Sequence, residues 1–289
     1  MKTYAFVTTA GMSLFLAVVS ILFCPAVTHS IASEAEAAVG EPVLFQISDD
    51  PGVFVVGEEL EYNVSYTIFD LGKVRFTVMD TISKFNKTVY VVKAFVDSYD
   101  GVPFVDLHQV FYSQMTSDPY SMLFTISNTA DPKETPYTQY TFDYANQKVS
   151  YEMGKKPQNT VSKKGTEPVT TFQQDGLSLF FYARSHCQQL KKESVPIFVN
   201  EKSFFTQFNF MNKIGSQEID AVSYPIETIE FDGTADFTGI FGLTGYFKGY
   251  FSNDKASIPI VAKMKVILGS IHIELIRWKR PGWIPPKAK

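Results

Sequence analysis

The sequence predicts an all-β, mainly antiparallel protein: a curved sheet or barrel-like single domain with one α-helix inside or covering it. Three observations predict this class. The 289 residues include 26 Phe and 15 Tyr, and these residue types favour strands. Apolar and polar residues alternate with a period of two in many short segments. Turn residues separate these segments at spacings of roughly 8–12 residues, which is typical of sandwiches and barrels.

The clearest strand covers residues 58–69. Its apolar side chains point to one side and its polar side chains to the other; the apolar set is Leu60, Tyr62, Val64, Tyr66 and Ile68. We expect a turn at residues 70–73 and a return strand from Val74. The same pattern predicts strands over residues 88–96, 104–112, 122–126, 137–144, 148–153, 195–199, 204–210, 226–231, 246–251, 258–267 and 271–278.

Three segments depart from the strand pattern. Residues 154–171 are polar, and we expect a surface loop there. Residues 175–190 have helical spacing after Asp175, a favourable N-cap, which predicts one helix against the concave side of the sheet. The tail, residues 281–289, is rich in proline, which lacks an amide donor. We therefore expect the tail to be extended, partly ordered at best and unable to continue the sheet.

The N-terminus has the pattern of an export signal. Lys2 is the only charge before Glu34, a long apolar run follows it, and Ser30-Ile31-Ala32 forms a small-x-small site after that run. These features predict a signal peptide over residues 1–32, followed by a short mature segment, 33–49, and one β domain over residues 50–280. We therefore expect export to a bacterial periplasm. The run is also long enough to span a bilayer, so the alternative is that it is retained as a membrane anchor. We expect membrane contact only in that case.

Composition excludes several classes of protein. A net charge of −4 gives no electrostatic basis for nucleic-acid binding. Cys24 lies in the signal segment, so Cys187 would be the lone mature thiol, without a disulfide partner. The histidines lack zinc-binding spacing, and neither a Gly-x-Ser-x-Gly elbow nor a phosphate-binding Gly-Lys-Ser/Thr motif occurs. We therefore expect no metal, no cofactor and no catalytic residue.

Three stretches in order resemble a known family. They are residues 56–66 with Leu71-Gly72, residues 174–184, and a set running from Gly239 through residues 251–254 and 258–260 to residues 269–271. This chain is similar, over about residues 50–280, to the bacterial exported family called domain of unknown function 3108. The resemblance implies an exported, mostly antiparallel β protein and brings no known activity or catalytic residue. Two departures from the family pattern are Gly176 and the absence of Trp from residues 246–251.

Arg184 is the leading candidate for ligand binding. A guanidinium among aromatic residues can bind a carboxylate or phosphate, so we group Arg184 with Phe181, Tyr182, Tyr62 and Tyr66. The alternative is structural: Arg184 pairs with an acid such as Asp254 or Glu230, or lies on aromatic faces. Asp175, Gly242 and Gly245 are expected to be structural, as the helix cap and as residues of a sheet corner or cavity lip.

These observations favour a non-enzymatic envelope protein that binds an apolar or amphiphilic ligand, such as a lipid, between its sheet and its helix. A second hypothesis is a structural or assembly factor that contacts another envelope protein through edge strands and the tail containing Trp283. A third is a hydrolase of envelope polymers, which requires two carboxylates that converge in a cleft.

Overall fold

The computed structural model describes residues 52–289 except 103–105, 238–243 and 266–269. The expected signal peptide 1–32, the segment 33–49, Gly239 and Gly242 lie outside the described residues. What is described belongs to one compact unit, Asp49–Lys289. Within that part of the chain, no helix is both long enough and apolar enough to cross a bilayer.

The described residues form one large antiparallel sheet and one helix, α2 (Gly176–His186). The fourteen strands are β1 (Glu59–Tyr66), β2 (Phe69–Lys84), β3 (Lys87–Ser98), β4 (His108–Thr116), β5 (Ser121–Asn128), β6 (Thr135–Asp143), β7 (Lys148–Lys156), β8 (Thr160–Pro168), β9 (Leu190–Val199), β10 (Lys202–Gln217), β11 (Ile226–Ala235), β12 (Gly245–Ser252), β13 (Pro259–Lys265) and β14 (Ser270–Lys279). The predicted all-β, curved-sheet fold with one helix is confirmed.

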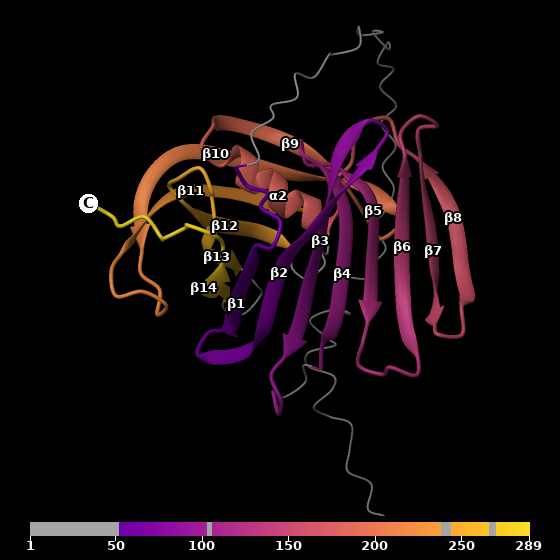
Figure 1. The fold of residues 1–289 in the computed structure, drawn as a ribbon, viewed down its shortest axis with the longest axis horizontal. Helices are drawn as coiled ribbons and strands as arrows, with labels where there is room; N and C mark the ends of the chain where they lie inside the picture. Colours follow the sequence, from indigo (N-terminus) through magenta and orange to yellow (C-terminus); the bar gives the residue numbers. More distant parts are fainter. Residues whose placement is uncertain (1–51, 103–105, 238–243, 266–269) are drawn as a thin grey trace, which may run out of the picture. The chain divides into compact units, whose positions relative to one another are not determined.

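The order of the strands explains the position of the helix. The sheet runs β8-β7-β6-β5-β4-β3-β2-β1-β14-β13-β12-β11-β10-β9, so β8 and β9 are its two edges. These two edge strands are consecutive in sequence, and α2 connects them. Figure 1 shows α2 between the two halves of the sheet, where it contacts β3, β4 and β9. The sheet therefore curls around its own connecting helix.

The two edges approach each other without pairing, so the sheet is curved but not closed. The residues before α2 form a bridge: Gln174 exchanges hydrogen bonds with Pro196 and Phe198 of β9, each 2.9 Å long. Glu201, in the turn after β9, accepts from the Tyr140 hydroxyl of β6 at 3.1 Å and pairs with Lys163 of β8 at 3.0 Å. These contacts hold the edges near each other and leave space between the sheet and the helix.

Aromatic side chains fill much of the concave face. Phe54 stacks between Tyr90 of β3 and Phe181 of α2, with ring centroids 4.2 and 4.6 Å away. In the other half, Phe231 of β11 stacks on Phe251 of β12 at 4.8 Å. Side chains are spaced differently along α2 and along the strands that face it. Large aromatic rings fill the space between the two surfaces.

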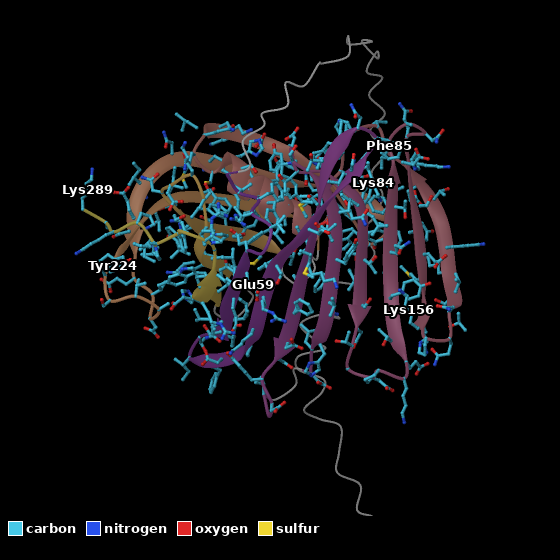
Figure 2. The ribbon with its side chains drawn as sticks, in the orientation of Figure 1. Glu59, Lys84, Phe85, Lys156, Tyr224 and Lys289 are labelled. Carbon is cyan, nitrogen blue, oxygen red and sulfur yellow. The ribbon has the colours of Figure 1, made fainter. Side chains whose placement is uncertain are left out.

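Two ends of the sheet are distinguished by their turns. Lys84 and Phe85 lie where β2 turns into β3, and Lys156 lies at the opposite end, where β7 ends (Figure 2). Because every neighbouring pair is antiparallel, the starts of the even-numbered strands and the ends of the odd-numbered strands all lie at the Lys156 end.

The expected loop over residues 154–171 is wrong. Residues 148–156 and 160–168 pair as the β7–β8 hairpin. Strand β8 is at the edge and is exposed along most of its length, so it needs no apolar face. Its lysines are typical of an edge strand that resists pairing with other chains. An alternation of apolar and polar residues cannot reveal a strand of this kind.

The boundaries of two predicted elements also differ. The helix ends at His186 rather than at residue 190, because Leu190 already pairs with Met211 in the β9–β10 ladder. The first turn falls at residues 67–68 rather than 70–73, with Thr67 in the left-handed region at φ 55°. Ile68, which continues the apolar alternation, is 87% exposed at that turn. The expected strand start at Phe104 lies outside the described residues, and β4 begins at His108.

The tail is more ordered than expected. The indole Nε1 of Trp283 donates to Asp254 Oδ2 at 2.8 Å, and its ring packs edge-to-face on Trp278. Lys287 forms a β-bridge with Ile226. Beside this bridge, the carbonyl oxygen of Pro286 accepts a hydrogen bond from Glu227 N at 2.8 Å. Proline lacks a donor but keeps its carbonyl, so one face of this segment can still pair with the sheet.

Candidate functional site

An apolar cavity of about 350 Å³ lies between α2 and the concave face of the sheet. Leu179, Phe180 and Ala183 of the helix form one wall. The other walls come from β4, β5 and β6 on one side and from β9 through β13 on the other. Its volume falls within the range of small-molecule sites.

The cavity reaches the Lys156 end of the sheet. Lining residues lie at the starts of β4 and β10 and at the ends of β9 and β11, and they extend along β12 and β13. The lining residues that the structure describes include no Asp, Glu, Lys, Arg or His. Gln109 and Asn200 contribute polar side chains that are partly or largely exposed to solvent. The interior is therefore suited to an uncharged, apolar group.

Asp175 fixes the start of the helix beside this cavity. Its carboxylate accepts from Leu177 N and Ser178 N at 2.7 and 2.8 Å, and Ser178 Oγ accepts from Asp175 N at 2.7 Å. Ser113 of β4 also donates to Asp175, at 2.6 Å. Complete burial raises the pKa of Asp175, against the lowering effect of the Ser113 hydrogen bond. The capping box thus anchors the helix to the sheet as well as starting it.

Arg184 is engaged by protein groups on every side. Its Nη1 and Nη2 donate to Glu58 at 2.7 and 3.2 Å, and its Nε and Nη2 also donate to the carbonyls of Ser257 and Ala256. Its acid partner is thus Glu58, not the expected Asp254 or Glu230. The guanidinium carbon also lies 5.1 Å from the centre of the Phe181 ring, as the alternative of an aromatic contact anticipated.

The other predicted ligand-binding residues are dispersed. Phe181 is fully buried against Phe54, and Tyr182 stacks on His186 with centroids 4.1 Å apart. Tyr62 is buried, and burial raises the pKa of its hydroxyl well above the ordinary value. Tyr66 is half-buried in β1. Neither these four residues nor Arg184 are among those that line the cavity in the described structure, and their role in binding a ligand stays a prediction.

Sequence reasoning missed Thr206, the most unusual residue of the cavity. The inner face of β10 carries Phe204, Thr206, Phe208 and Phe210 in succession, so one hydroxyl interrupts a row of phenyl rings. Thr206 lines the cavity and is completely buried, and its Oγ1 has no hydrogen-bond partner among the described residues. The sequence did contain a signal for this residue: Thr206 is the one polar residue among phenylalanines that recur at every second position.

Glycine shapes the cavity wall at one position. Gly249 of β12 is paired across the ladder with Phe231 of β11, and the Phe231 ring lies directly over it. A Cβ at residue 249 would overlap that ring. Gly245 begins β12 at φ 82°, a conformation that favours glycine.

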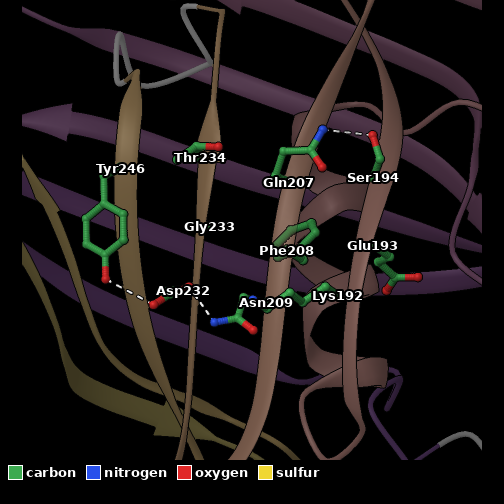
Figure 3. A pocket seen from close by; sticks show the side chains of 10 residues that line it. All are labelled: Lys192, Glu193, Ser194, Gln207, Phe208, Asn209, Asp232, Gly233, Thr234 and Tyr246. Atoms are coloured by element: carbon green, nitrogen blue, oxygen red, sulfur yellow. Dashed lines mark hydrogen bonds between the residues drawn. The ribbon is translucent and has the colours of Figure 1, made fainter.

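A second hollow lies on the outer face of β9–β12 and is polar (Figure 3). Asp232 accepts from Asn209 at 3.0 Å and from Tyr246 at 3.1 Å, and Gln207 donates to Ser194 at 2.8 Å (Figure 3). Glu193, the other carboxylate of this hollow, pairs with Lys191. Both carboxylates thus have partners within the sheet. The hydrolase hypothesis stays a prediction.

Two other features bear on the sequence hypotheses. In the part of the chain that the structure describes, no group of three or more His, Cys, Asp or Glu side chains is placed to hold a metal ion. The tail, which the assembly-factor hypothesis uses as a contact surface, instead packs Trp283 on its own sheet.

Comparison with known families identifies the chain. The model of a family described as a protein of unknown function, DUF3108, matches residues 61–276. This chain belongs to the DUF3108 family. No curated protein matches the DUF3108 chain.

Two solved structures are similar to this DUF3108 protein. One is a beta-barrel-like protein of the domain of unknown function DUF1849 from Brucella abortus, with 12% identity and a TM-score of 0.44, covering 78% of this chain and 98% of that one. Another is a protein from Bacteroides fragilis, inferred to be exported and with a YmcC-like fold, with 8% identity and a TM-score of 0.33, covering 78% of this chain and 97% of that one.

Proposed function

We propose that this DUF3108 protein is an exported envelope protein that binds an apolar or amphiphilic ligand, such as a lipid, without catalysing a reaction. The cavity beneath α2 is the observation that supports this function. A void of about 350 Å³ with apolar walls leaves its lining atoms without contacts on one side, which a well-packed core avoids. A ligand would restore those contacts.

The architecture around the cavity also supports binding. The capping box of Asp175 and the Glu58–Arg184 pair attach both parts of the short helix to the rest of the domain. The helix is therefore fixed in place, and its residues Leu179, Phe180 and Ala183 line the cavity together with residues of β11–β13. A preformed cavity of this kind reduces the ordering that a ligand must impose when it binds.

Export is part of the same proposal and rests on the N-terminal sequence. The lone Lys2, the apolar run and the small residues around Ala32 are the pattern of a cleaved signal. The mass of the protein purified from the periplasmic fraction tests it: loss of residues 1–32 is expected, and an intact N-terminus on that protein would contradict cleavage.

Native mass spectrometry of the freshly purified protein tests ligand binding. We expect a co-purified apolar molecule, and saturable binding of an apolar fluorescent probe once that molecule has been removed. Ala235→Trp should abolish both, because residue 235 lines the cavity and the indole would fill it. Thr234→Trp is the matched control, since the neighbouring side chain lies on the outer face and contributes to the polar hollow.

A second variant guards against misfolding. Ala262→Phe enters the same cavity from β13 and should also block the probe. Circular dichroism and the thermal midpoint establish that each variant is folded. The proposal fails if the parent protein carries no ligand and binds no probe, or if folded Ala235→Trp and Ala262→Phe proteins bind the probe as tightly as the parent.

A further inference from the structure

We infer that the cavity selects an uncharged amphiphile whose hydroxyl or carbonyl group forms a hydrogen bond with Thr206. This inference rests on the proposed function and specifies its ligand class. Neutral amphiphiles with one such group include fatty alcohols, acylglycerols and esters. Charged amphiphiles, such as fatty acids and alkylammonium ions, are the class that the cavity should reject.

The first observation is the Thr206 hydroxyl itself. The side chain is completely buried, and its Oγ1 finds no partner among the described residues. A buried hydroxyl without a hydrogen bond destabilises the folded protein. Valine has nearly the same shape and would avoid that cost. Thr206 lines the cavity, so a ligand there could supply the partner that its hydroxyl lacks.

The second observation is the environment of Thr206 in the sheet. Its cross-strand neighbours are Ala235 of β11 and Val195 of β9, neither of which has a polar side chain. Phe208, two residues along the same face, also lines the cavity. The Thr206 hydroxyl is therefore surrounded by apolar neighbours on β9–β11, and it would fix the depth and orientation of one polar group of the ligand.

The third observation is the absence of charge from the walls. The described lining residues include no ionisable acid or base other than tyrosine. Glu201, near the opening, is already engaged by Tyr140 and Lys163. The buried Arg184 is engaged by Glu58. A carboxylate or ammonium group inside the cavity would lose its hydration without gaining a counter-ion, and this cost is large.

A matched series of fluorescent probes tests the inference. The three probes are 2-ethylnaphthalene, 2-naphthalenemethanol and 2-naphthoate, which share one ring system and differ in having no polar group, a hydroxyl or a carboxylate. Binding to the delipidated protein is measured for the parent, Thr206→Val and Thr206→Ser. We expect the alcohol to bind the parent and Thr206→Ser alike, and to bind Thr206→Val roughly three- to tenfold more weakly.

The other two probes are the internal controls. Ethylnaphthalene should bind the parent and Thr206→Val with the same affinity, because it cannot use the hydroxyl. Naphthoate should bind all three proteins at least ~100-fold more weakly than the alcohol. In the ligand-free protein Thr206→Val should raise the thermal midpoint, since it removes an unpaired buried hydroxyl. A lower midpoint would instead indicate that the hydroxyl has a structural role.

The outcomes separate this inference from the proposed function. If none of the three probes binds and no apolar molecule co-purifies, the proposed function fails. If ethylnaphthalene binds but the alcohol gains nothing from Thr206, or naphthoate binds as tightly as the alcohol, ligand binding stands and the assignment of a neutral hydrogen-bonding ligand is overturned.

Discussion

Arg184 and Glu58 form a buried, bidentate ion pair although 126 residues separate them in the sequence. The Nη1–Oε1 and Nη2–Oε2 distances are 2.7 and 3.2 Å. Arg280 also donates to the Glu58 carboxylate. Glu58 directly precedes β1, Arg280 directly follows β14, and Arg184 is on α2. The Glu58 carboxylate therefore connects the helix to the first and last strands of the sheet.

Loss of the Glu58 charge should destabilise the protein strongly. Glu58→Gln leaves two buried or nearly buried guanidinium groups without a counter-ion, and breaking such a pair costs about 3–5 kcal/mol. We expect a fall in thermal midpoint on the order of 10 °C. Glu59→Gln is the matched control, because its 3.4 Å pair with Lys279 is exposed and is worth ~1 kcal/mol or less. Equal midpoints for the two variants would contradict a structural role for the buried pair.

Stability should fall in acid partly because of His186. Burial lowers the pKa of this imidazole, and Lys191 lowers it further. The Tyr182 carbonyl, Glu193 and Asp118 act in the raising direction without overcoming burial. The unfolded chain therefore takes up a proton near pH ~6.5, before the folded one does, so this contribution to stability is present above that pH and is lost as the pH falls.

Thermal melts between pH 7.5 and 5.5 measure this effect. The drop in midpoint should be smaller for His186→Gln than for the parent. His108→Gln should act in the opposite sense, because a hydrogen bond to Asp97 raises the pKa of His108, whose contribution is present at low pH and lost as the pH rises. Identical pH profiles for both variants and the parent would show that neither shift affects folding.

Cys187 should be unreactive in the folded protein. The thiol is completely buried, and burial raises its pKa to about 11. At pH 8 the thiolate, which is the reactive form, should be about a hundredfold scarcer than in an unfolded chain. Alkylation by iodoacetamide, located by peptide mass spectrometry, should therefore modify Cys187 only in denaturant. Rapid modification in native buffer would mean that the helix C-terminus opens readily.

Gly249 should not tolerate a methyl group. Gly249→Ala places a Cβ against the Phe231 ring, so the ring must move into the cavity, and such overpacking costs about 1–3 kcal/mol. Gly215→Ala, in β10, is the control because no atom lies within 4 Å of its Cβ position. Denaturant titrations should show destabilisation only for Gly249→Ala, together with weaker probe binding. Equal stability of the two variants would show that the ring adapts without cost.

The local patterns were good predictors of the elements themselves. Alternation around Tyr62 and the row of phenylalanines from Phe204 to Phe210 located strands that the sheet contains. Asp175 marked the start of the helix because capping is a short-range interaction between residues a few positions apart. The edge strand β8 was missed since neither of its faces is buried, and burial is the only source of the alternating signal.

The members of the site were harder to predict. Arg184 was conspicuous by its residue type, yet its partner Glu58 lies on a distant segment and could not be chosen from among the other acids. Thr206 was overlooked because a threonine in a strand is ordinary until its neighbours are known to leave its hydroxyl unpaired. Such properties depend on which strands are adjacent.

The period and the helix cap act over a few residues, so local patterns were enough to predict a large antiparallel β domain with one capped helix. The folded chain adds three features: the helix connects the two edges of one sheet, Glu58 pairs with Arg184, and an apolar cavity lined by the unpaired Thr206 hydroxyl remains between α2 and the sheet. The two levels differ in the range of the interactions that produce them. Cavities and buried charge pairs arise from surfaces that meet across more than a hundred residues, where the distance along the chain no longer limits which side chains become neighbours.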